Sequence, residues 1–248
     1  MKTFALMEQI LAFVYPDVCQ ICEHGFAPRR EGYVCGPCRL GAQGVRRIEP
    51  PFCHCCGLPF EGAITVAFTC ANCLGQDLHF RSARSAVEFT GVVREAIHGY
   101  KYNHKIWFET FLAALLVEAA RPHLSREDWD FLVPIPLHWM KRLERSFNQA
   151  ARLARELSRA TGIPVHDRLL KRVRRTKVQA RLPRQARAEN VKGAFAYRGP
   201  ASLAEARLVL IDDVMTTGAT ASACAKVLRQ NGARVVDVWT VARNRLKL

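Results

Sequence analysis

Nine of the ten cysteines in this chain of 248 residues lie within 55 consecutive positions, and eight of them form four Cys-x2-Cys pairs. Twelve residues separate the first two pairs, and thirteen separate the last two. Two thiolates three positions apart on a tight turn can both reach one ion at about 2.3 Å, and a second pair completes a tetrahedron. This spacing predicts two structural zinc ions in a double zinc ribbon. In sequential order, the ligands of the first ion are Cys19, Cys22, Cys35 and Cys38, and those of the second are Cys53, Cys56, Cys70 and Cys73.

Other uses of these cysteines are less favoured. Four pairs that share one short gap suit metal ligands better than disulfide bridges. An interleaved use of the four pairs is the alternative to the sequential one. Cys55 is expected to be a spare thiol, and His54 and His79 are candidate substitute ligands. Both zinc sites are expected to be structural, because four thiolates leave no open position for chemistry.

The cysteine-rich third of the chain has few large apolar side chains, so the metal is expected to replace a hydrophobic core there. The sequence therefore predicts an N-terminal helix and double zinc-ribbon domain at residues 1–80, followed by a second domain at 81–248. Glu8 and Gln9 interrupt the apolar run at residues 1–16, which is unlike a secretory signal. No stretch reaches the roughly 18 apolar residues of a membrane span. We expect a cytoplasmic protein without membrane insertion, whose cysteines remain thiols or metal thiolates.

Positive charge is concentrated in the second of these domains. The chain has 37 Lys and Arg against 22 Asp and Glu. Residues 1–80 hold 6 basic and 7 acidic side chains, and residues 81–248 hold 31 and 15, a net charge of +16. Such a local surplus favours an anionic partner, such as the phosphates of a nucleotide, a nucleic acid or a lipid.

Beyond residue 80, strand and helix patterns alternate along the chain. Apolar runs and period-two alternation predict strands at 83–89, 131–135, 208–211 and 235–241. Helical spacing of apolar residues predicts helices at 92–100, 108–119, 149–160 and 220–230. This order predicts an α/β fold with a mostly parallel sheet and helices on both faces. We expect Cys224 to be a small core residue, and Trp129, Trp139 and Trp239 to pack in the core or at a hinge.

One segment combines carboxylates with an anion-binding turn. Asp212 and Asp213 follow the buried strand at 208–211, and a Thr-Thr-Gly-Ala-Thr turn then opens a helix. The free N–H groups and the positive end of that helix favour a phosphate, and the neighbouring carboxylates can accept hydrogen bonds from sugar hydroxyls. A ribose 5-phosphate fits both halves. The predicted phosphate-binding residues are Asp212, Asp213, Thr216, Thr217, Gly218, Ala219 and Thr220.

The run at residues 211–220 resembles the 5-phosphoribosyl 1-diphosphate (PRPP) loop of type I phosphoribosyltransferases. Further features narrow the likeness: the cysteine pairs, the runs at 133–137 and 145–149, then Thr176, Gln179, Leu182, Arg187, Asn190 and Phe195. In that order and spacing they are similar to the ComF family of competence proteins, of the ComFC and GntX type. The likeness covers nearly the whole chain, although Ser146 stands where members of the family usually have glycine.

The resemblance implies a type I phosphoribosyltransferase-like fold, with zinc ribbons in place of a base-binding hood, and a role in DNA uptake during natural transformation. It also implies that the acidic pair holds the ribose hydroxyls and that Mg²⁺ accompanies PRPP if the site is active. A DNA-translocating ATPase is an expected partner, because the chain has no G-x-x-x-x-G-K-[ST] sequence to power transport itself. The segment that resembles the pyrophosphate loop contains Leu137, His138, Lys141, Arg142 and Arg145.

Residues 168–192 hold ten basic side chains and one acidic side chain, Glu189. Three interpretations are open: a flap that closes over pyrophosphate, a sleeve for the backbone of single-stranded DNA, and a solvated loop. Without regular apolar periodicity, we do not expect a packed element here. His138 is expected at a helix entry or on the surface. The DNA-binding candidates are Arg172, Arg174, Arg175, Lys177, Arg184 and Arg187.

Two classes of function remain open at this point. In one, the chain is a binding module of the DNA-uptake machinery that keeps a phosphoribosyl pocket. In the other, it is a phosphoribosyltransferase in which an unidentified nitrogenous nucleophile displaces pyrophosphate from PRPP, with Asp212 and Asp213 as the catalytic residues.

Overall fold

The computed structural model describes residues 17–62, 64, 66–138, 140, 147–174, 176, 184–199 and 202–245. The helix expected within residues 1–16 lies outside them. The contacts divide the chain into two compact units. The first unit contains the described residues up to Val45 together with Thr90–Leu112, and the second contains Arg46–Phe89 and the residues from Ala113 onward. The domain boundary expected at residue 80 stays a prediction, because compact units need not coincide with inherited domains.

The first unit combines the first four paired cysteines with a small helical core. Its elements are η1 (Arg29–Glu31), α2 (Gly36–Leu40), α3 (Gly91–Tyr102) and the first turn of α4 (Phe108–Ala120). Helix α3 buries residues at helical spacing, among them Val93, Ile97 and Tyr100. Gly32 has a φ of 66°, and a Cβ there would lie 2.4 Å from the backbone nitrogen of Phe111. Only glycine fits this turn against α4.

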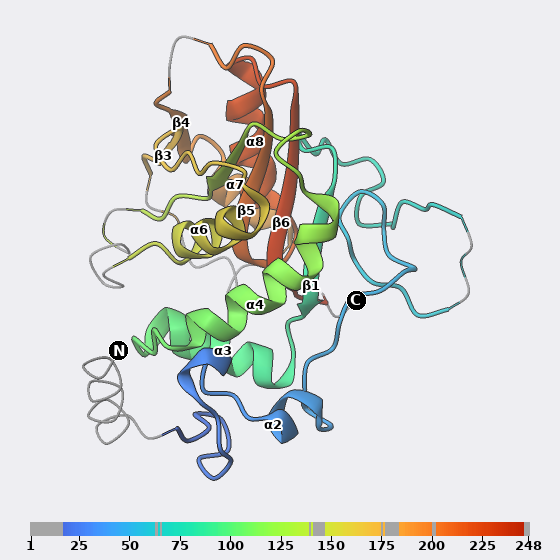
Figure 1. Ribbon diagram of the computed structural model, residues 1–248. Coiled ribbons are helices and arrows are strands. Elements are labelled where there is room, and N and C mark those ends of the chain that lie inside the picture. The colour runs from blue at the N-terminus through green and yellow to red at the C-terminus, as the bar shows by residue number, and fades with distance from the viewer. Residues whose placement is uncertain are drawn as a thin grey trace, which may run out of the picture. The chain divides into compact units, whose positions relative to one another are not determined.

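The second unit is built on a four-stranded sheet whose neighbouring strands all run parallel (Figure 1). The strand order is β1-β6-β5-β2, formed by β1 (Ala83–Glu88), β6 (Val235–Arg243), β5 (Arg207–Met215) and β2 (Phe131–Pro134). A separate antiparallel pair joins β3 (Leu170–Arg172) to β4 (Phe195–Tyr197). A 3₁₀ turn, η2 (Arg121–His123), follows α4.

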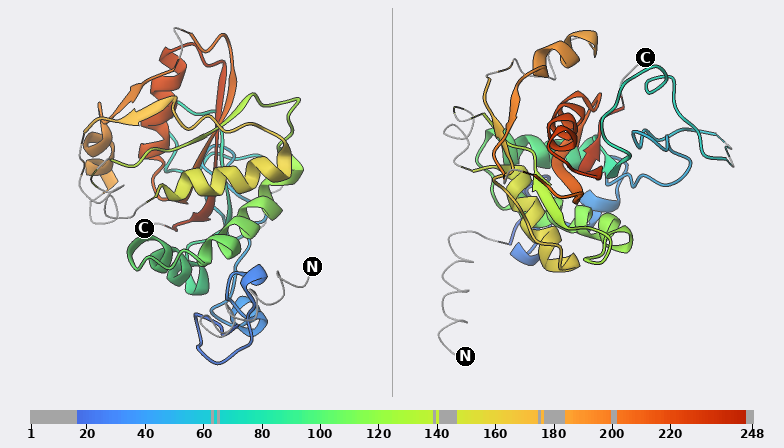
Figure 2. Two further views of the ribbon diagram at one scale, coloured as in Figure 1. Left: turned by 60° about the vertical axis from the view of Figure 1, so that its left-hand side comes forward. Right: turned by 90° about the horizontal axis from the view of Figure 1, so that it is seen from above.

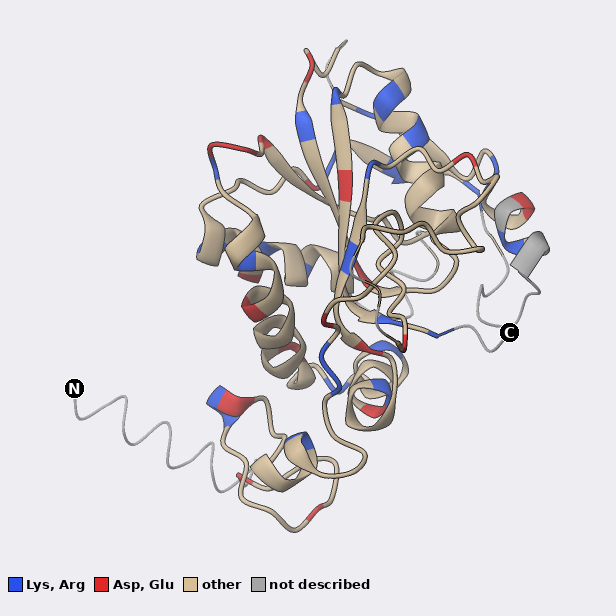
Figure 3. Ribbon diagram, turned by 90° about the vertical axis from the view of Figure 1, so that its right-hand side faces the viewer, with Lys and Arg blue, Asp and Glu red and all other residues tan. Residues whose placement is uncertain are grey.

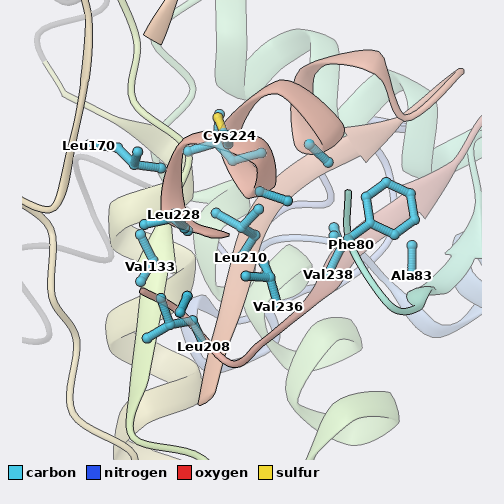
Figure 4. Close-up of a cluster of buried hydrophobic side chains, with 14 of the residues drawn as sticks. Phe80, Ala83, Val133, Leu170, Leu208, Leu210, Cys224, Leu228, Val236 and Val238 are labelled. Carbon is cyan, nitrogen blue, oxygen red and sulfur yellow. The ribbon is translucent and has the colours of Figure 1, made fainter. Parts of the chain in front are cut away.

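Helices cover both faces of the sheet. Leu208 and Leu210 of β5 pack in one cluster with Cys224 and Leu228 of α8 (Ala219–Gln230) (Figure 4). The intervening residues of β5 point to the opposite face, because side chains alternate along a strand. There α6 (Gln149–Thr161) lies against β5 and β2, on the other side of the sheet from α8 (Figure 2). The predicted α/β fold with a mostly parallel sheet is confirmed.

The two ends of α6 show why it forms where the sequence indicates. The Asn148 side chain accepts a hydrogen bond from the N–H of Ala150 and so caps the first turn. Gly162 ends the helix with a φ of 74°, and its N–H bonds back to the carbonyl of Ser158. Within the part of the chain that the structure describes, no helix has both the length and the apolarity needed to cross a membrane.

Two expectations about secondary structure are corrected. Strand β5 continues to Met215, so Asp212 and Asp213 belong to the strand and not to the loop after it. The expectation of no packed element at 168–192 is wrong, because β3 and the helix α7 (Arg184–Val191) lie there. Helix α7 packs on α8 and buries Val191. A single short helix with one buried side leaves too few apolar positions to give a periodic signal.

Candidate functional site

The eight paired cysteines form two clusters with the geometry of tetrahedral metal sites. Within each cluster, all four Sγ atoms lie within 4.8 Å of one another. Sγ–Sγ distances are 3.8 Å for Cys19–Cys38 and 3.7 Å for Cys56–Cys70. A tetrahedron of sulfurs at 2.3 Å from zinc has edges of roughly 3.8 Å. The donor sets therefore fit structural zinc. The first cluster is Cys19, Cys22, Cys35 and Cys38, and the second is Cys53, Cys56, Cys70 and Cys73, so the structure groups the cysteines in sequential order.

Backbone N–H groups prepare both clusters for a cation. Hydrogen bonds from the backbone near His24 and Gly25 lower the pKa of Cys22 to about 6. Burial acts to raise the pKa of Cys53, but backbone N–H donors lower it on balance to about 7. Burial and the negative charge of Cys56 raise the pKa of Cys70 to about 11. Backbone donors and the repulsion between crowded thiolates both favour a bound divalent cation.

Cys55 and the two nearby histidines lie outside these clusters. The clusters found among the described residues include neither Cys55 nor His54 nor His79. Burial raises the pKa of the Cys55 thiol. The Cys55 carbonyl accepts a hydrogen bond of 2.8 Å from the N–H of Ala83 and so joins the ribbon to the first residue of β1.

The second cluster is part of the core of the second unit. Cys53, Cys56 and Cys73 are buried in one cluster of apolar side chains with Phe80 and Val238. Phe80 and Ala83 lie beside Val238 of β6 (Figure 4). The expectation that metal replaces a core throughout the cysteine-rich third therefore needs correction, because here the metal site and the hydrophobic core are continuous.

The turn after β5 presents backbone N–H groups at the end of a helix. Gly218 has a φ of 80° and is the N-cap of α8, and its carbonyl accepts the first helical bond, from Ser222. Among the described residues, the N–H groups of Thr217 and Gly218 have no hydrogen-bond acceptor. Thr216, Thr217 and Thr220 are half-buried. This end of the 212–220 segment has the local geometry of an anion site.

The two carboxylates of the segment lie in different environments. They are adjacent in β5, so their side chains point to opposite faces of the sheet. Asp212 is half-buried and its charge, after burial itself, raises the pKa of Cys224 in α8. Asp213 is 6% exposed, and its N–H donates to Oδ1 of Asp212 at 2.9 Å. The sequence identified the pair but could not distinguish its two members.

Only part of the expected pyrophosphate loop belongs to the described residues. Leu137 is half-buried. His138 is buried, and its Nδ1 accepts from the N–H of Met140 at 3.4 Å. Met140 is helical, so His138 lies at a helix entry as expected and not on the surface. Lys141, Arg142 and Arg145 lie outside the described residues, as does Trp139.

The DNA-binding candidates occupy contrasting positions. Arg172 Cζ lies 5.3 Å from the centroid of the Phe195 ring, and Nη2 donates a hydrogen bond to the Thr176 hydroxyl. Burial lowers the pKa of Arg172. Arg187 is 8% exposed, and its pKa is also lowered by burial. Arg174 is exposed, with Nη2 donating to the carbonyls of Asn190 and Lys192. The partial burial of Arg172 and the burial of Arg187 disfavour direct phosphate contacts by these two side chains. Arg175, Lys177 and the side chain of Arg184 lie outside the described part of the chain.

Other predictions about buried residues are confirmed. Cys224, Trp129 and Trp239 are buried in the second unit. Sequence reasoning missed Arg243, whose fully buried guanidinium contacts both the second cluster and the 212–220 segment. The only signal for it was a charged residue at the end of an apolar strand.

The comparisons with known proteins agree with the double zinc ribbon and extend over most of the chain. Residues 10–74 match the model of the double zinc ribbon domain. The chain is 31% identical over 198 residues to competence protein F of Haemophilus influenzae, covering 78% of this chain and 85% of that protein. It is 30% identical over 231 residues to the DNA utilization protein YhgH of Salmonella typhimurium, covering 92% and 97%.

A more distant likeness is found among solved structures. A purine phosphoribosyltransferase from Pyrococcus horikoshii is 17% identical, with a TM-score of 0.33, over 56% of this chain and 84% of that one. At that TM-score the fold assignment depends on the parallel sheet and its helices. The relatives are similar enough in sequence, over enough of their length, to establish the family. This chain belongs to the ComF family of competence proteins.

Proposed function

We propose that this chain acts in DNA uptake during natural transformation, with a pocket for PRPP or a related phosphoribosyl ligand and a basic surface for single-stranded DNA. The pocket is carried by one observation: β5 brings Asp212 and Asp213 to the start of α8, where Gly218 turns the chain and leaves N–H groups available. The names of the relatives, competence protein and DNA utilization protein, support the role in DNA uptake.

The 5-phosphate would lie at the N-terminus of α8. This helix has 12 residues, long enough for its dipole to direct a partial positive charge toward an anion. The N–H groups of Thr217 and Gly218 would donate to phosphate oxygens, and the threonine hydroxyls would add donors. Asp212, half-buried, would accept from the ribose hydroxyls. Mg²⁺ bound with PRPP would neutralise the pyrophosphate, together with Lys141, Arg142 and Arg145.

The experiment for the pocket is calorimetry of the wild-type protein with PRPP and Mg²⁺, with ribose 5-phosphate and pyrophosphate as separate ligands. We expect saturable binding of PRPP, weaker binding of each part alone, and a higher Tm with PRPP, because ligand that binds only the folded state stabilises it. Absence of heat and of any Tm shift at millimolar PRPP would exclude the pocket and leave a DNA-uptake module without a nucleotide ligand.

Single-stranded DNA would bind through its phosphates. Residues 81–248 carry a net charge of +16. Among the described residues, Lys and Arg lie on several helices, strands and loops (Figure 3). Residues 168–192 contain no aromatic side chain, so we propose backbone-led binding with little base preference. The exposed basic side chains there include Lys171, Arg174 and Lys192.

Affinity for single-stranded DNA is expected to fall linearly with salt on a double-logarithmic plot. Replacing Lys171, Arg174 and Lys192 by glutamine should flatten the slope by about 0.7 for each phosphate that the variant no longer neutralises. The matched control changes three exposed basic residues around α8, namely Lys226, Arg229 and Arg234. Fluorescence anisotropy at a series of salt concentrations measures both slopes. Equal slopes for the two triple variants and the wild type would place the DNA site elsewhere.

Phosphoribosyl transfer is the second candidate function, favoured by the acidic pair beside the helix terminus. The enzyme would displace pyrophosphate from C1 of PRPP with a nitrogenous acceptor. Release of pyrophosphate that depends on an added acceptor distinguishes transfer from binding alone. A DNA-translocating ATPase is the proposed partner of the binding module, since the chain has no phosphate-binding loop of the ATPase type.

A further inference from the structure

Arg243 is a buried charge at the last position of β6. It is 1% exposed and is among the largest fully buried side chains of the described residues. In the sheet it lies opposite Met215, the last residue of β5. A guanidinium in such a place is costly unless it is hydrogen-bonded and neutralised.

The contacts of Arg243 reach two sites that are far apart in the sequence. Its Nη1 donates to the carbonyl oxygen of Met215 at 3.1 Å and to the carbonyl of Thr216. Its Nη2 donates to Sγ of Cys56 at 3.4 Å. One rigid, planar group therefore joins a ligand of the second cluster to the backbone of the 212–220 segment.

The anionic partner of Arg243 is the second cluster. Among the ion pairs of the described residues none involves Arg243, and Glu88, its neighbour across the sheet, pairs instead with Arg245. Four thiolates around a divalent zinc ion carry excess negative charge. Occupied by zinc, the second cluster neutralises the guanidinium and accepts its hydrogen bond.

Contacts from the end of β6 and from the end of the ribbon support the same turn. The N–H of Asn244 donates to the Met215 carbonyl at 2.9 Å, next to the Arg243 contact. The N–H of His79 donates to Oγ of Ser222 in the first turn of α8 at 3.2 Å. A Cβ placed on Gly218 would lie 3.4 Å from the ring of Phe80. The end of the ribbon is therefore packed under the turn that carries the Thr217 and Gly218 N–H groups.

We propose that Arg243 is a positioning residue through which the second zinc centre holds the 212–220 segment in its anion-binding form. Its effect on ligand affinity rests on the proposed phosphoribosyl pocket, whereas its effect on the shape of the segment does not. Zinc in the first cluster has no such role.

The first test compares Arg243→Lys with Arg245→Lys. Lysine keeps the charge, but its single ammonium cannot span Cys56 and the two carbonyls. Arg245 is the control because it follows the same strand and pairs with Glu61 and Glu88 away from the segment. We expect Arg243→Lys to keep two zinc ions, to speed hydrogen exchange at the N–H groups of Ser222 and Asn244, and to weaken PRPP binding roughly tenfold. Exchange and affinity equal to those of Arg245→Lys would overturn the proposal.

A second test needs no substitution, so it holds even if Arg243→Lys does not fold. Cadmium in place of zinc gives one NMR resonance for each four-cysteine centre. We expect PRPP to shift the resonance of the second centre and to leave that of the first unchanged. Equal shifts, or no shift on addition of PRPP that calorimetry shows to be bound, would contradict the proposal. If calorimetry detects no PRPP binding, the proposed pocket fails, and the hydrogen-exchange comparison alone decides the role of Arg243.

Discussion

Gly218→Val is expected to abolish PRPP binding, and Asp212→Asn is expected to weaken it roughly ten- to a hundredfold. Asp213→Asn, on the opposite face of the sheet, is expected to weaken it less. Gly218 has a φ of 80°, and a Cβ there would approach Cε of Met215 to 2.7 Å. A β-branched residue cannot adopt this backbone conformation, so the turn shifts and its N–H groups no longer point toward the phosphate. The Asn variants keep volume and remove charge, so the fold is expected to persist and the hydroxyl acceptors to weaken.

Calorimetry with PRPP and Mg²⁺ measures the three affinities, and thermal unfolding measures the fold. Gly162→Val is the matched control, because Gly162 has a similar φ of 74° but no atom within 4 Å of an added Cβ. It separates the strain of a positive φ from damage to the turn, and it should lower the Tm while leaving PRPP affinity intact. Wild-type affinity in all three segment variants would mean that the motif is inherited without being used.

Cys53→Ser is expected to unfold the second unit, whereas Cys35→Ser should disrupt the first cluster and leave the sheet folded. Cys53 belongs to the same buried cluster as Phe80 and Val238, so loss of its metal opens the core. Structural zinc contributes about 10 to 16 kcal/mol in small zinc domains, as much as the whole stability of a typical domain. Cys35 lies in a small cluster with Cys19 and Ala27, within the first unit.

Elemental analysis and thermal unfolding, followed by circular dichroism, provide the measurement. We expect two zinc ions in the wild type and one in folded Cys35→Ser. Cys55→Ser is a close control, since Cys55 lies between two ligands of the second cluster in sequence but outside the cluster. It should retain both ions and the wild-type Tm. A Cys53→Ser protein with two ions and an intact sheet would show that the second cluster is dispensable.

The features that the sequence predicts well are those whose parts are contiguous or regularly spaced. Paired cysteines reveal their ligand sets, because each zinc knuckle is local and its two ligands lie three positions apart. The same holds for the acidic pair and the turn at Gly218, which occur in one short run. The order of strands and helices follows from the period of the apolar residues.

The rest depends on contacts between distant parts of the chain. Arg243 and Cys56 are 187 positions apart, and nothing in the pattern around either residue indicates the other. Arg172 belongs to a basic run that the sequence leaves open as a flap, a DNA sleeve or a solvated loop, and its guanidinium lies over Phe195. Charge counts along a sequence do not distinguish a stacked arginine from an exposed one, because an aromatic ring can shelter the former.

The position of β1 also sets the order in which the molecule can assemble. β1 is synthesised early, directly after the second cluster, but its neighbour in the sheet is β6, the last strand, with Ala83 opposite Val238. Until β6 emerges from the ribosome, that edge of β1 has no strand to pair with, and an unpaired strand edge promotes aggregation. Ile48 and Arg46, already synthesised, form backbone hydrogen bonds with Ala86 and Glu88 on the outer side. Such long-range pairing makes folding slow, and zinc bound during synthesis would fix the ribbon beside β1 while the partner strand is still missing.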